Sequence, residues 1–203
     1  MYLLVAATEL EIKLARSLLA ERPEIECVVS GIGPVEMTLA LSGKLATTPR
    51  RYAGVINIGV AGAFVGTEPK VLDICLAGKE VFGDLGICSG DRIDSFAAGL
   101  PVVREFELAG ELLSLAEKRL LAAGYPVHRG NFVTVNCASG TRARGEWLRD
   151  QHHALCENME GAAAARVCQH FDVPLLELRC ISNLVEDRDT SRWRLTEASE
   201  RAC

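Results

Sequence analysis

The stretch from Tyr2 to Leu19, YLLVAATELEIKLARSLL, joins a short apolar run to a pattern that is typical of an amphipathic helix. Tyr2–Ala7 predicts a buried strand, and Glu9–Leu19 predicts a helix that begins where this strand ends. A strand followed directly by a helix is the unit from which parallel sheets with helical layers are built. This stretch therefore predicts an α/β fold.

The same alternation continues along the chain. Further strand-like runs rich in Val, Ile and Leu lie at Cys27–Ser30, Gly54–Ile58, Val71–Ala77, Gly130–Asn136 and Leu175–Ile181. Helical patterns lie at Pro34–Leu45, Glu107–Ala123 and Met159–His170, and residues 59–70 and 88–101 are rich in turn residues and predict loops. The pattern predicts three α/β/α layers around a central mixed, mainly parallel sheet, in one domain over residues 1–203.

The composition points to a small-molecule partner. The chain has 203 residues, of which 49% are hydrophobic, so it can bury a substantial core. A formal net charge of -5 opposes binding to nucleic acid, because a phosphate backbone needs a basic surface.

The eight cysteines include no CxxC pair, so we expect neither a metal site nor a disulfide. We also expect no cofactor. Several lie in apolar runs, where a free thiol packs as a small hydrophobic group in a reducing compartment. The first residues lack the basic segment of a secretory signal, and no uncharged apolar stretch is long enough to cross a bilayer. We expect a cytoplasmic protein that does not bind a membrane.

Candidate site residues follow the predicted strands, where ligands of open α/β sheets bind. Glu9 and Glu11 open the first helix. Either both only cap that helix and complement its dipole, which the segment alone favours, or one carboxylate faces a pocket and activates water as a general base.

Two glycine-containing segments allow close approach of the backbone. Ser30–Glu36, SGIGPVE, departs from the dinucleotide-binding fingerprint because Glu36 occupies the third glycine position. It can form a tight turn, or a turn that approaches a sugar or an anion. Gly59–Gly62, in INIGVAG, fits either contact with a flat base or ribose, or close packing of strand against helix.

Polar residues also mark the two last predicted elements. Glu160 in ENMEGAA opens an alanine-rich helix, and it either binds a ribose diol or complements the helix dipole. Asn183 in RCISNLVEDRD ends a strand, and its amide can both donate and accept along the edge of a base. The charged residues 186–189 that follow also fit a solvated loop with internal ion pairs.

Taken in order, these five segments resemble the signature series of the nucleoside phosphorylase/hydrolase superfamily, especially its methylthioadenosine/S-adenosylhomocysteine nucleosidase branch, over nearly the whole chain. The resemblance implies that Glu11 polarises the attacking water, that Glu160 binds the ribose hydroxyls and that Met159 packs on the sugar. It also implies substrate-binding roles for Gly59, Val60, Ala61, Gly62, Ala138, Ser139, Asn158 and Ser182. Finally, it implies a homo-oligomer, either a dimer or a tetramer.

Two features refine the implied chemistry. The first loop offers Thr8 and Glu11 without an arginine, and because a carboxylate repels phosphate, hydrolysis is favoured over phosphorolysis. The adenine-specific nucleosidases have an aspartate after Ile-Ser, whereas this chain has Asn183. An amide can donate to O6 and accept from a protonated N7, so a 6-oxopurine such as hypoxanthine is implied.

The segments ENMEG, ISNLVEDRDTSRW and FGDLG resemble the futalosine hydrolases within the superfamily. That resemblance implies hydrolysis of the N-glycosidic bond of futalosine to hypoxanthine and dehypoxanthine futalosine, in menaquinone biosynthesis. The alternatives are a methylthioadenosine/S-adenosylhomocysteine or aminodeoxyfutalosine nucleosidase, a 6-oxopurine nucleoside phosphorylase, and a non-catalytic nucleoside-binding protein.

Two roles implied by this resemblance have several candidates. The proton that N7 gains can come from Asp187 or Asp189, directly or through water, although both also fit as caps of their loop. The benzoate of futalosine calls for an arginine, and Arg92, Arg142 and Arg144 lie in predicted loops. Residues 196–203 resemble only the opening of the long last helix of the superfamily, so we expect a short one.

Overall fold

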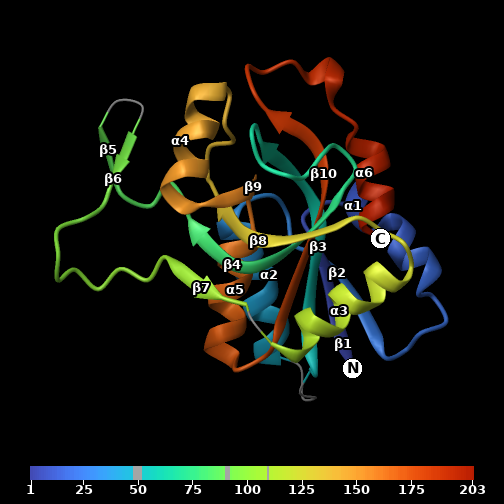
Figure 1. The fold of residues 1–203 in the computed structure, drawn as a ribbon. Helices are drawn as coiled ribbons and strands as arrows, with labels where there is room; N and C mark the ends of the chain where they lie inside the picture. Colours follow the sequence, from blue (N-terminus) through green and yellow to red (C-terminus); the bar gives the residue numbers. More distant parts are fainter. Residues whose placement is uncertain (48–51, 90–91, 109) are drawn as a thin grey trace.

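The computed structural model describes residues 1–47, 52–89, 92–108 and 110–203, and it has the predicted α/β architecture (Figure 1). The strands are β1 (Tyr2–Ala6), β2 (Ile25–Val29), β3 (Gly54–Phe64), β4 (Ile74–Phe82), β5 (Ile87–Ser89), β6 (Arg92–Asp94), β7 (Glu105–Glu107), β8 (Val127–Thr134), β9 (Ala154–Asn158) and β10 (Leu175–Val185). The helices are α1 (Glu9–Leu18), α2 (Pro34–Thr47), α3 (Glu111–Ala122), α4 (Arg142–His152), α5 (Gly161–Phe171) and α6 (Leu195–Ala202), with a 3-10 turn at Thr190–Arg192.

The central sheet is mixed and mainly parallel, as predicted. Its strands follow the order β10-β4-β8-β9-β3-β1-β2, and β7 pairs with β4. The pairs β1–β2, β1–β3, β3–β10, β4–β8 and β8–β9 are parallel, whereas β3–β9, β4–β10 and β4–β7 are antiparallel. Because β3 pairs with both β9 and β10, it lies between the strand that carries Glu157 and the strand that carries Asn183.

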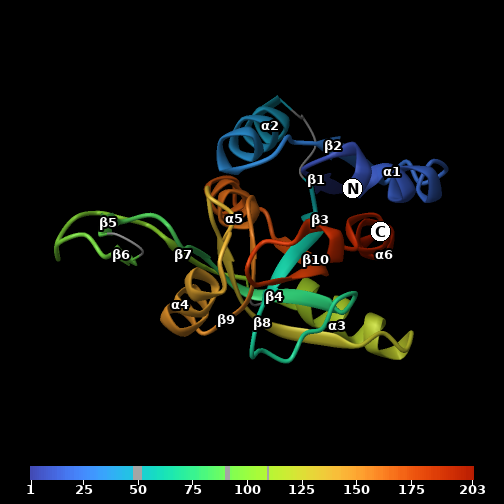
Figure 2. The same cartoon turned by 90° about the horizontal axis from the view of Figure 1, so that it is seen from above.

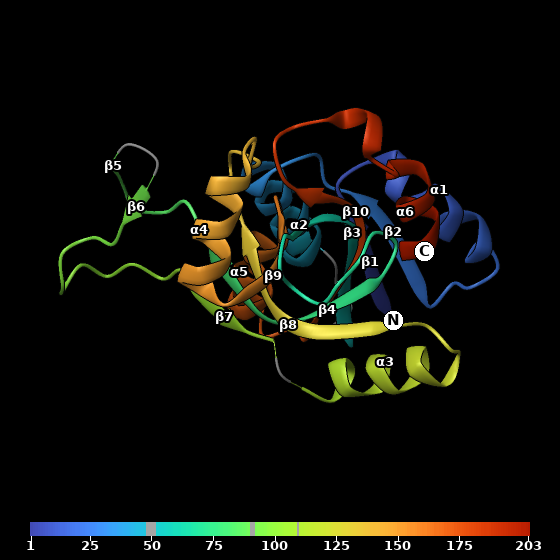
Figure 3. The ribbon, with the colours of Figure 1, turned by 45° about the horizontal axis from the view of Figure 1, so that its top comes forward.

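Side-chain alternation along β1 assigns helices to the two faces of the sheet. Leu3 and Val5 pack with α2 and α5, whereas Leu4 and Ala6 pack with Ile12 of α1. Helix α6 covers β10 beside α1, and α3 covers the part of the sheet formed by β4 and β10 (Figure 2). The hairpin of β5 and β6 extends away from these layers (Figure 3).

The structure corrects several predicted boundaries. Residues 59–64 of the first predicted loop continue strand β3, because small residues there pack in the buried sheet. The second predicted loop contains β5 and β6, and its residues 90 and 91 lie outside the described part. Residues 105–107 form a strand, so helix α3 begins at Glu111, four residues later than predicted. The last helix, α6, spans Leu195–Ala202.

The cysteines at positions 75, 156, 168 and 180 are buried free thiols, in keeping with their apolar sequence context. In the four described ranges, no helix combines the length and apolar character needed to cross a bilayer. The described residues also hold no group of three or more His, Cys, Asp or Glu side chains arranged to bind a metal ion.

Candidate active site

A cavity of about 330 Å³ lies where β1, β3 and β10 lead into polar loops and where α1 and α5 begin. Eleven of the thirteen predicted site residues line it: Glu11, Val60, Ala61, Gly62, Ala138, Ser139, Asn158, Met159, Glu160, Ser182 and Asn183. The other two, Gly59 and Asp187, do not line it. Five segments that are distant in the sequence therefore meet around one space.

Glu11 both caps helix α1 and lines the cavity. Its Oε2 accepts hydrogen bonds from the backbone N (3.0 Å) and the hydroxyl (2.8 Å) of Thr8, which closes a capping box at the start of α1. Its Oε1 accepts from Val60 N at 3.0 Å, and the side chain, only 6% exposed, borders the cavity. In contrast, Glu9 is exposed and pairs with Arg16.

Gly59 lies beneath the cavity and makes this arrangement possible. A Cβ at this position would stand 2.7 Å from Oε1 of Glu11 and 2.5 Å from Nη1 of Arg179. No real Cβ approaches other atoms this closely, so a larger residue would displace one of the two charged groups. At Gly59, the groups that approach the backbone closely are therefore the side chains of Glu11 and Arg179, and not a ligand.

Glu160 caps α5 from a buried position. Its Oε1 accepts from Gly33 N at 3.0 Å, and its Oε2 lies 3.5 Å from Nη1 of Arg179. Burial raises the pKa of this carboxyl group, while the charge of Arg179 and the Gly33 bond act in the opposite direction. Gly33 has a φ of +94°, a conformation that favours glycine. The turn SGIGPVE thus approaches an anion of the protein itself, the Glu160 carboxylate.

A buried polar network, not predicted from the sequence, lies behind Glu160. Arg179, 1% exposed, donates from Nε to Oε1 of Glu177 at 3.0 Å. Glu80, also fully buried, accepts from Thr134 Oγ1 at 2.8 Å and from Asn158 Nδ2. Both glutamates come from strand interiors, β10 and β4.

Asn158 connects this network to the cavity. Its Oδ1 accepts from the backbone N of Glu160 (2.9 Å) and of Gly161 (2.7 Å), and so fixes the first turn of α5. The ideal Cβ of Gly161 would stand 2.1 Å from Oε1 of Glu80 and 2.4 Å from Oε1 of Glu177, so the two carboxyl groups lie side by side against this glycine. Burial, followed by the charge of Glu177, raises the pKa of Glu80 well above 4.5.

Asn183 faces the cavity from a bulge in β10. The pairing of β10 with β3 shifts register between Ile181 and Asn183, which places Ser182 at the irregularity. Ser182 Oγ donates to Oδ1 of Asn183 at 2.7 Å, and Nδ2 of Asn183 donates to Leu184 O at 3.1 Å. One amide N–H and one lone pair of Oδ1 remain for a ligand, which is the capacity expected for recognition of a base edge.

Glu157 also lines the cavity, although it was not among the predicted site residues. Its carboxylate accepts from Ser139 N at 2.8 Å and from Ser139 Oγ at 2.6 Å, and the residue is 7% exposed. Burial raises its pKa, against the effect of the two Ser139 bonds. The signal in the sequence was the first acid of ENME, a carboxylate that follows the apolar residues 154–156 directly.

Asp187 does not line this cavity, but it lines a neighbouring one of about 250 Å³ together with Asn183 and Ser139. It is exposed, and its Oδ1 accepts from the backbone N of Arg142 at 3.2 Å, at the start of α4. Asp189 caps the short turn that follows, where Ser191 donates to it from N (3.1 Å) and Oγ (2.6 Å). These contacts agree with the alternative in which both aspartates cap their loop.

The arginine that borders the cavity is not one of the three considered from the sequence. Arg92, Arg142 and Arg144 do not line it, whereas Arg188 does, with its guanidinium 4.6 Å from the ring centroid of Trp193. Arg142 instead pairs with Glu146 at 2.7 Å.

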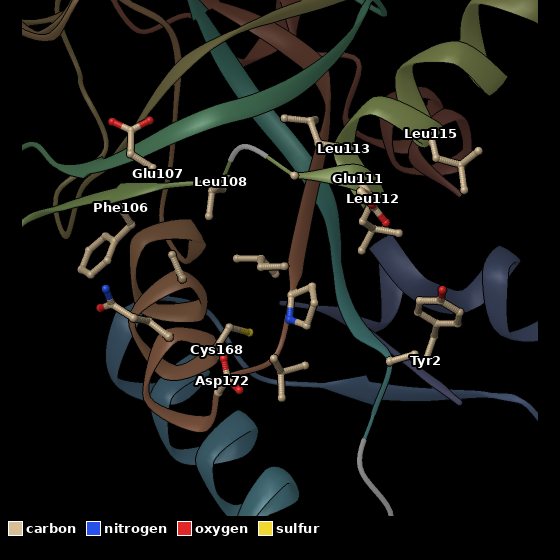
Figure 4. A pocket seen from close by; sticks show the side chains of 17 residues that line it. Tyr2, Phe106, Glu107, Leu108, Glu111, Leu112, Leu113, Leu115, Cys168 and Asp172 are labelled. Carbon is tan, nitrogen blue, oxygen red and sulfur yellow. The ribbon is translucent and has the colours of Figure 1, made fainter.

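A larger cavity, of about 670 Å³, lies at the other end of the sheet, between α3 and α5 (Figure 4). Its walls include Tyr2, Phe106, Leu112 and Cys168, and none of the predicted site residues lines it. We take the smaller cavity as the candidate site, in spite of its size, because the predicted polar residues Glu11, Glu160 and Asn183 line it.

Comparisons with known proteins show the family of the chain. A family model described as the phosphorylase superfamily matches residues 7–203. The chain is 32% identical to the futalosine hydrolase of Streptomyces coelicolor, over 85% of this chain and 73% of that protein. It is 34% identical to the futalosine hydrolase of Thermus thermophilus, over 83% and 73%.

Among solved structures, the chain is similar to a 5'-methylthioadenosine/S-adenosylhomocysteine nucleosidase from Helicobacter pylori, which was crystallised with butyl-thio-DADMe-Immucillin-A. The TM-score is 0.88 and the sequence identity is 24%, over 99% of this chain and 93% of that one. At this identity the likeness establishes the fold.

Proposed function

Because the chain belongs to the phosphorylase superfamily, we propose that it is an N-glycosyl hydrolase that cleaves futalosine to hypoxanthine and dehypoxanthine futalosine. The observation that carries this proposal is the meeting of Glu11, Glu160 and Asn183 around one cavity. Two buried carboxylates and a base-facing amide provide a group for water, a group for ribose and a group for the purine. The similarity to two futalosine hydrolases supports the substrate.

In the proposed reaction, Glu11 orients and deprotonates the attacking water. The Glu11 side chain lines the cavity, with Oε1 fixed by Val60 N and Oε2 fixed by Thr8. A base held from both sides in this way keeps one orientation during proton transfer. The bond from the base to the sugar stretches as an oxocarbenium-like sugar forms, and the water adds its hydroxyl to the anomeric carbon.

Glu160 binds the ribose hydroxyls, and Met159 packs against the sugar. The Glu160 carboxylate retains lone pairs beyond its contacts with Gly33 and Arg179, and these accept from a diol. Close contact with Arg179 offsets the cost of burying this negative charge. The carboxylates that surround the site would also repel a phosphate nucleophile, which supports hydrolysis over phosphorolysis.

Asn183 selects the leaving base. Its free N–H donates to O6 of hypoxanthine, and Oδ1 accepts from a protonated N7. Because an amide is not an acid at working pH, the proton itself comes from another donor, with water entering along the open side of the cavity. The contacts of Asp187 at the start of α4 favour such a water over direct transfer from that aspartate.

A second function is favoured by the similarity of the fold to an S-adenosylhomocysteine nucleosidase, namely cleavage of an adenine nucleoside. Chromatography of the reaction products distinguishes the two. The purified protein is incubated without phosphate, separately with futalosine, inosine and methylthioadenosine. Hypoxanthine from futalosine supports the proposal, and adenine from methylthioadenosine supports the second function. Turnover only after phosphate is added would indicate a phosphorylase, and no free base under any condition would indicate a binding protein.

A further inference from the structure

Gly62 lies in register with two polar residues of the cavity, one on each neighbouring strand. On one side, Gly62 of β3 pairs with Asn183 of β10, and on the other side it pairs with Glu157 of β9. All three residues line the cavity. Adjacent strands are about 4.8 Å apart, so an amide and a carboxylate flank a glycine at a separation of roughly 10 Å between their backbones.

The glycine leaves the space between these two groups open. A Cβ on Gly62 would stand 2.9 Å from Val185 Cγ2 and 3.2 Å from Asn183 Nδ2, so any side chain here would crowd Asn183. Without one, a flat base can lie over the backbone of β3, with one edge towards Asn183 and the other towards Glu157.

Among the described residues, the hydrogen bonds to the Glu157 carboxylate come from a single residue. Both of its hydrogen bonds come from Ser139, through N at 2.8 Å and Oγ at 2.6 Å. Burial raises the pKa of this carboxyl group and the positive charge of Arg144 lowers it, but among the described residues the two side chains do not form an ion pair. A carboxylate oxygen accepts more than one hydrogen bond, so acceptor capacity remains for a donor in the cavity.

We propose that Glu157 is a specificity-determining residue, whose carboxylate accepts a hydrogen bond from N1–H of a 6-oxopurine base held at its O6 and N7 by Asn183. This inference rests on the proposed function and extends it to the opposite edge of the base.

The chemistry of the two purine classes supports this role. A 6-oxopurine carries a proton on N1, next to the acceptor O6, whereas a 6-aminopurine carries a lone pair on N1, next to a donor amino group. A carboxylate therefore attracts the N1 side of the first class and repels that of the second. Together, Glu157 and Asn183 complement the donor and acceptor order of hypoxanthine at both edges.

Product binding tests the inference without depending on turnover. Calorimetric titration of the wild-type protein with hypoxanthine and with 1-methylhypoxanthine, which has no N1–H, gives a ratio of two dissociation constants. We expect hypoxanthine to bind about 10- to 100-fold more tightly, the range for a hydrogen bond to a buried charged group. Glu157→Leu should weaken hypoxanthine binding by that factor and leave 1-methylhypoxanthine binding unchanged or improved.

Two variants serve as controls. Thermal unfolding shows whether the leucine variant folds. If it does not, Glu157→Gln, which keeps the side-chain volume, replaces it and should give a ratio of dissociation constants between that of the wild type and one. Glu200→Leu, an exposed position on α6, should keep the wild-type ratio.

An unchanged ratio in folded Glu157 variants would overturn the inference and leave Glu157 as an anchor for the Ser139 loop. The proposed function would stand in that case, because hypoxanthine still binds. A wild-type protein that binds adenine but not hypoxanthine would overturn the 6-oxopurine assignment, and with it this inference.

Discussion

Nη1 of Arg179 lies 3.5 Å from Oε2 of Glu160, and the two side chains are only 1% and 6% exposed. Arg179 also donates to Glu177. One buried cation thus faces two buried carboxyl groups, one of which borders the cavity. The geometry of the site therefore depends on a contact behind it as well as on the residues that line it.

Replacing Arg179 by Gln should destabilise the protein by about 3–5 kcal/mol, because two buried carboxyl groups would lose their only close cation among the described residues. Urea unfolding measures this change. Arg166→Gln, at an exposed position on α5, should alter the free energy of unfolding by less than about 0.5 kcal/mol. A loss of less than 1 kcal/mol in the Arg179 variant would show that water satisfies the carboxyl groups instead.

Glu11→Gln should reduce turnover by about 10²- to 10⁴-fold and leave binding of hypoxanthine unchanged, because the amide cannot deprotonate water. The fold should persist, since glutamine also completes a capping box with Thr8. Glu9→Gln provides the matched control from the same helical turn, where the side chain is exposed. Equal losses in both variants would remove the basis for a catalytic role of Glu11.

Asn183→Asp should weaken binding of hypoxanthine by about 10- to 100-fold, because an ionised carboxylate cannot donate to O6 and instead repels it. Calorimetry with hypoxanthine and adenine measures the change. The variant should release relatively more adenine from methylthioadenosine than the wild type does. Retention of full hypoxanthine affinity would place the base elsewhere in the cavity.

Asp187→Asn should change turnover by less than about threefold, because an amide oxygen still accepts from Arg142 N at the start of α4. The pH profile of kcat decides the matter. If the variant loses turnover by a factor of 100 or more, and loses the alkaline limb of the profile, then Asp187 supplies the proton in spite of its position outside the cavity.

Glu80→Gln should change how stability depends on pH. Burial raises the native pKa of Glu80 well above 4.5, so the native state holds a proton that the unfolded state releases. The stabilisation is complete below pH 4.5 and is lost as pH rises through the native pKa, with a slope of up to about 1.4 kcal/mol per pH unit.

Glutamine is neutral at every pH, so Glu80→Gln removes the contribution of Glu80 to the slope of the free energy of unfolding against pH. Relative to the wild type, Glu80→Gln should therefore gain stability as the pH rises above 4.5, measured by urea unfolding at several pH values. Glu200→Gln, at an exposed position, is the control and should run parallel to the wild type. A parallel curve for Glu80→Gln as well would mean that Glu80 titrates normally.

The sequence predicted the layers of the fold because apolar periodicity records burial within one element. It missed α4, whose sequence RARGEWLRDQH has few apolar positions, and β9, whose ALCEN mixes polar with apolar residues. Both elements acquire their structure from tertiary contacts, such as those of Leu148 with Val133 and Val185.

The residues of the candidate site also divide into those that local sequence predicts and those that depend on tertiary contacts. Glu11, Glu160 and Asn183 were predictable because each follows or opens an element within a distinctive motif. Glu80 and Glu177 were not, since a glutamate inside a strand looks like a surface charge until the fold places both against Gly161. Glu80, for example, is bound by Thr134 and Asn158, which lie 54 and 78 positions away in the chain, and no local pattern contains such partners.

The double attachment of Glu11 has a consequence for motion. The same carboxylate that closes the first turn of α1 also faces the cavity, so fraying of that turn would remove the Thr8 contacts and release the side chain from Val60. Under the proposed role of Glu11 as the base for water, conformations with this turn open are inactive. Amide exchange at Thr8 and Val60, whose N–H groups donate to the Glu11 carboxylate, reports how often these contacts open and would therefore also report the fraction of such molecules.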